Sequence, residues 1–107
     1  MSDLDAAFGA LSDATRRKAL LLLTRRELRA GELAQHLGLA APAMSKHLKV
    51  LRDSKLVEID ADASDARAKV YRLRRAGFRE VSGWLEGVER FWSDQLEGFT
   101  AYAERKR

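Results

Sequence analysis

The residues best suited to hold another molecule lie in one short stretch, residues 40–55 (AAPAMSKHLKVLRDSK). Pro42 suits the first turn of a helix, where a missing N–H is tolerated. Met44, Leu48 and Leu51 follow at i, i+4 and i+7, the spacing of one buried helical face. The opposite face is small, hydroxylated and basic, with a histidine at its margin: Pro42, Ala43, Ser45, Lys46, His47 and Lys49. Such a helix can be held by its back while its front enters a DNA groove, although an ordinary solvated amphipathic helix shows the same pattern.

Side chains for covalent or metal-assisted chemistry are scarce in this chain. It has no cysteine, which excludes disulfides, thiolate metal sites and cysteine nucleophiles. Its two histidines, His36 and His47, lie close together in the sequence, and there is no glycine-rich phosphate loop. We therefore expect no enzyme activity, no cofactor and no metal site, and we interpret His36 as a surface or partly packed residue.

Charge is distributed unevenly along the 107 residues. Residues 1–75 hold 15 basic and 10 acidic side chains, whereas residues 76–107 hold 5 and 6. A basic first part joined to a nearly neutral last part suggests a polyanion-binding face and an association element. An apolar fraction of 46% with a single proline favours one folded, mostly helical domain. Because no apolar run approaches the ~18–20 residues that span a bilayer, we expect a cytoplasmic protein, nucleoid-associated when bound to DNA.

Two helices are predicted ahead of this region. Leu4, Phe8 and Leu11 share one face of a first helix over residues 3–11. Asp13 suits the N-cap of a second helix over residues 14–26, because its carboxylate can accept from the free N–H groups of the first turn. The block 19–23 is apolar on every side, so we expect neighbours to cover it all round. Six basic residues flank it, most of them expected to be solvated and one or two to reach phosphates: Arg16, Arg17, Lys18, Arg25, Arg26 and Arg29.

A third, brief helix leads into the Pro42 helix. Leu33, Ala34 and Leu37 form its inner face, and Gly38 followed by Leu39 predicts a glycine-terminated helix end. Two short helices joined by a tight glycine-containing turn are the outline of a helix-turn-helix.

A β-hairpin is predicted directly after the helix-turn-helix. Residues 56–60 (LVEID) and 69–73 (KVYRL) alternate, with Val57 and Ile59 able to face Tyr71 and Leu73. The intervening ADASDARA is polar and lacks glycine. A hairpin in this position is typical of the wing of a winged-helix domain, and a plain connector is the alternative.

The last predicted helix, from residue 76 to about residue 104, is long for this chain. Two sets of side chains repeat every seven residues in offset registers: Phe78, Leu85, Trp92 and Phe99, and Val81, Val88, Gln95 and Tyr102. One small domain cannot cover so many large apolar side chains, so we expect burial against a second copy rather than packing within one monomer. The predicted dimer interface consists of Leu4, Phe8, Trp84, Leu85, Val88, Phe91, Trp92, Leu96 and Phe99.

Four segments resemble the ArsR/SmtB family of bacterial winged-helix repressors, over nearly the whole chain. They are ALSDATRRKAL (10–20), GELAQHLGL (31–39), APAMSKHLKVLRDSKLV (41–57) and VYRL (70–73). The aromatic pattern of Trp84, Phe91, Trp92 and Leu96 looks like the branch without a metal-sensing site. The resemblance implies a mainly α winged helix-turn-helix with a β-hairpin wing. It also implies a two-fold dimer built by the first and last helices, operator binding by the fourth helix and wing, and repression relieved by an effector.

Several positions depart from the family pattern. Ala14 stands where proline is common, and glycine is usual near Lys55. Ala40 and Ala41 stand where serine and glutamine are common. Loss of the N-cap oxygen removes on the order of 0.5–2 kcal/mol from a helix end, and loss of the glutamine removes a reader of adenine.

The wing and the metal-site positions depart as well. The wing holds four acids, Glu58, Asp60, Asp62 and Asp65, so we expect only Arg67 and Lys69 to assist DNA binding there. The family's metal sites need a thiolate on the third helix or paired histidines and carboxylates on the last helix. This chain has no cysteine and no histidine beyond His47, so we expect no metal sensing.

These observations predict one domain over residues 1–107, with a DNA-binding core at about 12–75 and a dimerisation helix at about 76–104. The predicted function is that of a homodimeric, sequence-specific repressor that binds double-stranded DNA at a near-palindromic operator and does not respond to metals. The predicted DNA contacts are Pro42, Ala43, Ser45, Lys46, His47, Lys49, Arg67 and Lys69. The alternative is a winged-helix protein-interaction module without DNA binding. A small apolar effector, a protein effector and no effector at all stay open.

Overall fold

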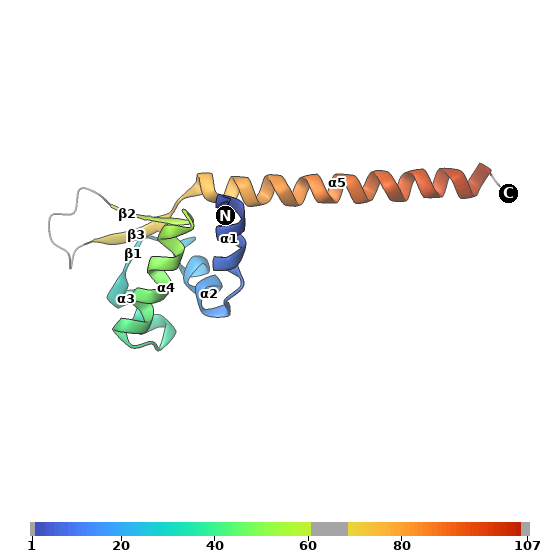
Figure 1. Ribbon diagram of the computed structural model, residues 1–107. Coiled ribbons are helices and arrows are strands. Elements are labelled where there is room, and N and C mark those ends of the chain that lie inside the picture. Colours follow the sequence, from blue (N-terminus) through green and yellow to red (C-terminus); the bar gives the residue numbers. More distant parts are fainter. Residues whose placement is uncertain (1, 61–68, 106–107) are drawn as a thin grey trace.

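The described chain consists of two helices, a short strand, two further helices, two strands and a long last helix. The computed structural model describes residues 2–60 and 69–105. The helices are α1 (Asp3–Leu11), α2 (Ala14–Leu23), α3 (Ala30–Leu37), α4 (Ala41–Asp53) and α5 (Arg75–Arg105) (Figure 1). The strands are β1 (Leu28–Arg29), β2 (Val57–Ile59) and β3 (Val70–Leu73). The predicted fold class, a mainly α winged helix-turn-helix with a hairpin wing, is confirmed.

Side-chain oxygens cap the starts of the first two helices. Ser2 Oγ accepts the Asp5 N–H at 3.1 Å, and Asp13 Oδ1 accepts the Arg16 N–H at 3.0 Å. The predicted N-cap at Asp13 is therefore confirmed. α2 ends at Leu23 rather than at residue 26, because the chain turns there to reach β1.

The apolar block of α2 is covered on one side only. Ala19, Leu20 and Leu23 are buried, whereas Leu21 is 66% exposed. The expectation that neighbours cover this block all round is therefore wrong. α2 packs against α1, α3, α4 and β3, and these elements leave the Leu21 side of the helix open to solvent.

A glycine turn joins α3 to α4 as the sequence predicts. Gly38 has a φ of 66°, and the Leu39 N–H donates to the Ala34 carbonyl at 2.9 Å. A positive φ suits glycine because it has no Cβ. α4 then begins with Pro42 in its first turn, and Ala40 before it has no side-chain oxygen to cap the helix.

A three-stranded antiparallel sheet with the order β1-β3-β2 completes the fold. Val57 pairs with Leu73 and Ile59 with Tyr71, which confirms the predicted hairpin register. β1 pairs with the other edge of β3. Two residues are too few to show an alternating pattern, so this strand has no sequence signal.

One hydrophobic core lies between the helices and the sheet. Its buried members come from every helix, from two strands and from the turn before β2: Ala7, Ala10, Ala19, Leu20, Leu23, Leu28, Leu33, Ala34, Met44, Leu48, Leu51, Leu56, Val57 and Val81. Met44, Leu48 and Leu51, the predicted back of α4, are at most 1% exposed. This burial fixes the orientation of α4.

The start of α5 approaches the turn after α4 very closely. The Lys55 carbonyl oxygen occupies the space that a Cβ on Gly77 would need. Lys55 itself has a φ of 63°, in the left-handed region that favours glycine. This conformation explains why the absence of glycine near Lys55 is a real departure from the family pattern.

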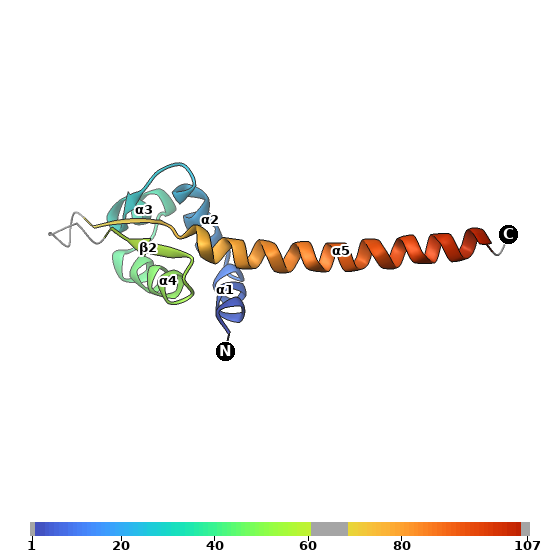
Figure 2. The ribbon, with the colours of Figure 1, turned by 90° about the horizontal axis from the view of Figure 1, so that it is seen from above.

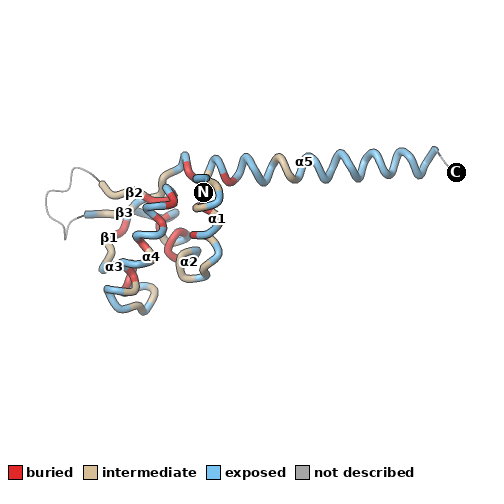
Figure 3. Tube along the Cα trace, in the orientation of Figure 1, coloured by how far each residue is buried: buried red, intermediate tan, exposed pale blue. Residues whose placement is uncertain are grey.

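α5 runs from the domain into solvent, close to the predicted range of 76–104. The molecule measures 70 × 27 × 27 Å because this helix projects from one side (Figures 1 and 2). Only Gly77 and Val81 of α5 are buried. Figure 3 shows that the second half of the helix is exposed all round.

Candidate nucleic-acid interface

The front of α4 faces solvent because its back is buried. Pro42, Ser45, Lys46 and Lys49 are exposed, and Ala43 is half-buried. The five side chains lie on the side of the helix opposite Met44, Leu48 and Leu51. The predicted contact residues of α4 therefore form one accessible strip on a rigidly held helix.

His47 lies at the edge of this strip, where α4 meets the start of α2. Its side chain is 22% exposed, and its Nδ1 lies 3.3 Å from Arg16 Nη1 and 4.0 Å from Asp13 Oδ1. The Arg16 backbone N–H, helped by the charges of Arg16 and His47, holds the pKa of the Asp13 carboxyl below its usual value. The structure thus places His47 at a boundary, and its contact with DNA stays a prediction.

Arg16 and Arg17 secure the end of α1, a role without a sequence signal. Arg16 donates from Nε to the Ala10 carbonyl at 2.8 Å and from Nη2 to the Gly9 carbonyl at 3.3 Å. Arg17 donates from Nη1 to the Leu11 carbonyl at 2.7 Å. The last carbonyls of a helix lack partners within it, so these two arginines satisfy them. Arg16 also joins α1 and α2 to His47 of α4.

Two lysines supply the charge of the α4 strip. Lys49 Nζ lies 2.8 Å from Asp53 Oδ2, one turn further along, and these side chains are 77% and 66% exposed. An exposed pair of this kind contributes only about 0.3–0.5 kcal/mol, so Lys49 can exchange Asp53 for a phosphate. Lys46 forms no ion pair with any residue that the structure describes.

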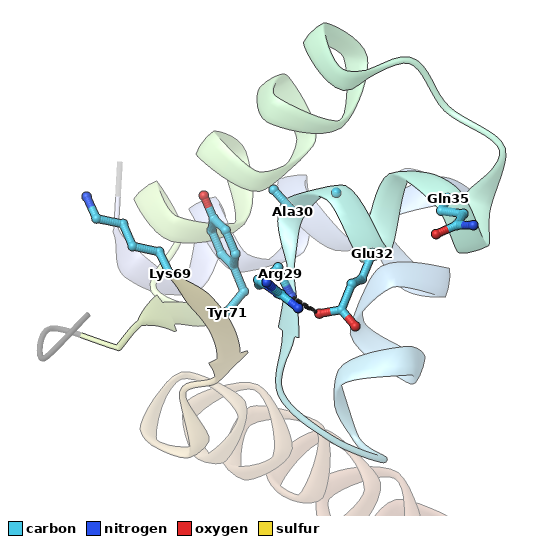
Figure 4. Close-up of a pocket in the computed structure, with 7 residues that line it drawn as sticks. Arg29, Ala30, Glu32, Gln35, Lys69 and Tyr71 are labelled. Carbon is cyan, nitrogen blue, oxygen red and sulfur yellow. Dashed lines mark hydrogen bonds and ion pairs between the residues drawn. The ribbon is translucent and has the colours of Figure 1, made fainter. Parts of the chain in front are cut away.

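A hollow of about 450 Å³ lies between the start of α3 and β3. Its lining consists of Arg29, Ala30, Gly31, Glu32, Gln35, Lys69 and Tyr71. Figure 4 shows Lys69, directly before β3, beside Tyr71 of β3, with Arg29 between Tyr71 and Glu32. Of these residues Lys69 is a predicted DNA contact, and Arg29 is one of the six basic residues of which one or two were expected to reach phosphates. Arg29 and Tyr71 come together because β1 pairs with β3, which the sequence pattern does not reveal.

Glu32 organises the basic side of this hollow. Its Oε1 accepts the Arg29 backbone N–H at 3.0 Å and lies 3.4 Å from Arg29 Nε, and its Oε2 lies 3.7 Å from Arg26 Nη2. The Arg29 backbone N–H is the main cause that holds the pKa of the Glu32 carboxyl below its usual value. The ionised carboxylate therefore orients Arg29 at the start of α3.

The acidic character of the wing is partly offset by a neighbouring strand. Glu58 pairs with Arg72 across the sheet, and their Oε1 and Nε lie 3.0 Å apart. The Asp60 backbone N–H donates to the Val70 carbonyl at 3.0 Å and extends the hairpin. The predicted contact Arg67 and the acids Asp62 and Asp65 lie outside the described residues.

The predicted dimer residues form a second surface, separate from the α4 strip. Phe8 and Trp84 pack edge to face with ring centroids 5.3 Å apart, which joins α1 to α5. Leu4, Phe8 and Val88 are half-buried, and Trp84 and Leu85 are about half exposed. Further along, Phe91, Trp92, Leu96 and Phe99 are between 59% and 71% exposed. A helix packed wholly within one monomer is therefore excluded for this chain.

The described part of the chain has neither a cluster of metal ligands nor a membrane-spanning helix. Within residues 2–60 and 69–105, no group of three or more histidine, cysteine or carboxylate side chains is placed to hold a metal ion. No helix in the same ranges is both long and apolar enough to cross a membrane.

Comparison with known proteins identifies one family that this chain resembles. Residues 13–58, which include α2, α3 and α4, match the family described as "Bacterial regulatory protein, arsR family". The chain is 37% identical over 95 residues to the HTH-type transcriptional regulator Rv2034 of Mycobacterium tuberculosis, which covers 89% of this chain and 83% of that protein. It is 29% identical over 82 residues to the transcriptional repressor SdpR of Bacillus subtilis, with 77% and 88% covered.

Comparison of the fold with solved structures agrees with the sequence comparison. The structure of an ArsR-like transcriptional regulator from Rhodococcus sp. RHA1 superposes with a TM-score of 0.81 and 31% sequence identity. The superposition covers 95% of this chain and 91% of that one. The long α5 is therefore included in a likeness that extends over nearly the whole molecule.

Proposed function

This chain belongs to the arsR family of bacterial regulatory proteins, which are transcriptional regulators and not enzymes, and we propose that it is a homodimeric repressor that binds a near-palindromic operator. The observation that carries the proposal is the accessible strip on α4, held by a fully buried back. A helix fixed in this way can enter a major groove without rearrangement. In this proposal residues 12–75 form the DNA-binding core and residues 76–104 the dimerisation helix.

The charges of the strip suit the DNA backbone. Lys46 and Lys49 on α4 and Lys69 beside the wing are exposed cations on separate elements. Arg67 is assigned to the same task from its place in the sequence. Contacts of this kind set the position of the protein on DNA and make its affinity depend on salt.

The rest of the strip lacks the side chains that recognise DNA bases most strongly. Positions 41–49 hold no arginine, asparagine or glutamine, the residues that read base edges with two hydrogen bonds. Ser45, His47 and Lys46 remain for polar base contacts, and Pro42 and Ala43 for thymine methyl groups. We therefore expect DNA shape to contribute much of the specificity, and the specificity to be modest.

The exposed apolar stripe of α5, which consists of Leu85, Phe91, Trp92, Leu96 and Phe99, supports a dimer. Two-fold symmetry places two copies of α4 in successive major grooves about 34–36 Å apart, and the operator then has matching dyad symmetry. The donor set does not favour regulation by metals, since the chain has no cysteine and α5 has no histidine. Such a repressor would act in the cytoplasm, where the chromosome lies.

Selection of bound sequences from a random DNA pool tests the proposal. With purified full-length protein, we expect enrichment of one motif with dyad symmetry and half-sites one helical turn apart. No enrichment, with the protein shown to be dimeric, would contradict sequence-specific binding.

Two substitutions on the strip separate phosphate contacts from base contacts. Lys49→Ala should weaken binding about equally for all sequences and lower the slope of log K against log salt by about one. Ser45→Ala should instead change the enriched motif and leave the salt slope unchanged. Both side chains are exposed, so neither change should unfold the domain. If neither variant differs from the native protein on any DNA, the assigned face of α4 is wrong.

A protein-interaction module without DNA binding is the second candidate. The large exposed aromatic surface of α5 and the missing side-chain cap at Ala40 favour it. Retention on non-specific DNA at low salt, lost as salt rises, would exclude this module, because a protein that does not bind DNA shows no such salt-dependent retention.

A further inference from the structure

His47 makes its polar contacts through one ring nitrogen. Its Nδ1 lies 3.3 Å from Arg16 Nη1 and 4.0 Å from Asp13 Oδ1, and the ring has no other hydrogen bond or ion pair with the described residues. No buried side-chain nitrogen or oxygen among these residues lacks a partner, so Nε2, which has none, is open to solvent. The ring therefore has one nitrogen bound inside the protein and one that is free to meet another molecule.

Arg16 decides which of the two nitrogens carries the proton. A guanidinium stays charged in proteins and has donors but no acceptor. The nitrogen that faces Arg16 Nη1 can therefore form a hydrogen bond only as an acceptor, and a neutral imidazole has one acceptor and one donor. Because Nδ1 is the acceptor, the proton of the neutral ring lies on Nε2. A further proton on Nδ1 would replace this hydrogen bond by repulsion between two cations.

Asp13 also faces the ring, but it lies too far away to reverse this assignment. Its Oδ1 is 4.0 Å from His47 Nδ1, which is beyond hydrogen-bonding distance. The same oxygen accepts the Arg16 backbone N–H at 3.0 Å. Of the two groups beside Nδ1, only the guanidinium at 3.3 Å is close enough for a hydrogen bond.

Arg16 is itself held in place, so the ring that it contacts is held as well. Its Nε donates to the Ala10 carbonyl at 2.8 Å and its Nη2 to the Gly9 carbonyl at 3.3 Å, which leaves Nη1 for His47. A planar guanidinium cannot turn one nitrogen away without disturbing the hydrogen bonds of the other two. This half-buried side chain thereby fixes the imidazole of α4 relative to the end of α1.

His47 lies one turn after Ala43, on the flank of the α4 strip. The first half of a recognition helix is the part that reaches base edges in the major groove. There guanine presents two neighbouring acceptors, N7 and O6, and thymine presents one acceptor beside its methyl group. Adenine has an amino group beside its N7, and cytosine presents only an amino group. A fixed N–H on Nε2 therefore suits guanine best and is opposed by the amino groups of adenine and cytosine.

We propose that Arg16 fixes His47 as a donor through Nε2–H, and that this donor selects guanine at one position of each operator half-site. The proposal rests on the dimeric repressor of the proposed function and names one of its base contacts. Arg16 is a positioning residue in this scheme, because it contacts His47 and leaves the base to the imidazole. The strip then has one base contact of fixed polarity beside the recognition of DNA shape.

NMR of the imidazole nitrogens measures the position of the proton. The chain has two histidines, so the exposed change His36→Gln leaves His47 as the sole source of these signals. At about pH 8, where an ordinary histidine is neutral, the DNA-free protein should carry the proton on Nε2. Arg16→Met should shift the proton toward Nδ1, because the nearby polar group is then Asp13, an acceptor. A proton on Nδ1 in the native protein, or an unchanged spectrum in Arg16→Met, overturns the assignment.

Arg17→Met is the matched control for Arg16→Met. Arg17 also donates to a carbonyl at the end of α1, and its replacement removes the same charge, but it does not contact His47. Its imidazole spectrum should therefore match that of the native protein, and circular dichroism should show both variants folded. An equal shift of the proton in the two variants would mean that the end of α1 controls the ring without the direct contact, and would overturn the role of Arg16.

Selection from a random DNA pool tests the base preference. The native motif should contain one guanine per half-site whose preference falls by on the order of tenfold in His47→Ala. His47→Gln, whose amide both donates and accepts, should shift the same position toward adenine. Arg16→Met should weaken the guanine preference, whereas Arg17→Met should leave it unchanged even where both bind all sequences less tightly. A dyad motif that His47→Ala leaves unchanged overturns the proposal and leaves the proposed repressor standing, and a native protein that enriches no motif overturns both.

A base analogue identifies the atom that His47 contacts. Replacement of that guanine by 7-deazaguanine exchanges N7 for a C–H group and keeps the base pair. This exchange should weaken binding of the native protein by about fivefold and should leave binding of His47→Ala unchanged. Equal losses in the two proteins would assign this base edge to another side chain and overturn the proposal.

Discussion

α4 and α5 are both amphipathic helices, but their apolar faces have different fates. The apolar face of α4 is at most 1% exposed and is covered by the chain's own helices and sheet. On the apolar face of α5 beyond Trp84, Val88 is half-buried, but the larger side chains are 51–71% exposed in the single chain: Leu85, Phe91, Trp92, Leu96, Phe99 and Tyr102. A helical repeat of apolar residues therefore predicts that a face is buried, but it does not predict whether the same chain or a second molecule buries it.

This difference in burial also suits the two helices to the different roles that we propose for them, DNA binding for α4 and dimerisation for α5. α4 needs no partner to be held, so its polar front can be offered to DNA at once. In the proposed dimer a second copy buries α5, and α5 would then couple the spacing of two α4 helices to dimer formation. Binding to an operator with two half-sites would therefore depend on protein concentration through α5.

The largest expected effect is a loss of folding stability, and it separates the two apolar faces when a leucine on each is replaced by alanine. Leu48→Ala removes a side chain that is 1% exposed in the core, and should lower the free energy of unfolding by about 2–5 kcal/mol. Leu96→Ala, at 63% exposure, should change it by no more than about 0.5 kcal/mol when the protein is dilute enough to be monomeric. Urea denaturation measures both, and equal losses would contradict the comparison.

Trp92→Ala should act on association and leave the fold intact. This side chain is 61% exposed in one chain and central to the stripe, so its loss should weaken the dimer by at least about 2 kcal/mol, roughly thirtyfold. Sedimentation equilibrium measures the change. Glu97→Ala, on the outer side of the same helix, is the control and should leave the dimer unchanged. A native dimer constant in Trp92→Ala would remove the stripe as the interface.

The junction between the two regions depends on one glycine. Gly77→Ala should destabilise the protein by about 1–3 kcal/mol, because its Cβ would meet the backbone carbonyl of Lys55. Gly83→Ala, which has no described atom within 4 Å of its Cβ position, should instead stabilise α5 by about 0.5–1 kcal/mol. Thermal unfolding followed by circular dichroism should separate the two, and a neutral Gly77→Ala would mean that α5 is not held as described.

The smallest effect concerns Asp13, the acid that caps the start of α2. Because the pKa of Asp13 is lowered in the folded state, its stabilisation is present above its ordinary value of 3.8 and is lost as pH falls through the folded value. Asp13→Asn keeps a capping oxygen and removes the titration. The native protein should therefore lose more stability than this variant between about pH 5 and pH 3. Equal losses in the two proteins, measured by urea unfolding at each pH, would argue against stabilisation by the ionised Asp13 carboxylate.

Much of the fold can be predicted because its signals are local. The Asp13 cap and the Gly38 turn each depend on a few neighbouring residues, and the structure has both. The back of α4 and the extent of α5 follow from helical spacing. The front of α4 is then predictable as an accessible strip, since it is whatever the buried back leaves outside.

The features that the sequence did not predict depend on contacts between distant segments. Leu21 lies in an apolar block that a helical pattern assigns to the interior, yet its neighbours stop short of it. β1 is too short for a period and depends on pairing with β3 from more than 40 residues away. Arg16 meets backbone carbonyls of α1, which every residue possesses and no pattern marks. Each outcome depends on which segments meet across the chain.

The sequence by itself determined which faces are apolar, where α2 begins and α3 ends, and the absence of cysteine chemistry, because these depend on residue type and spacing. Only the tertiary structure decided which of these faces the chain covers itself. Four helices and a small sheet have enough surface to bury the back of α4, but α5 projects past them, so its large apolar side chains stay exposed.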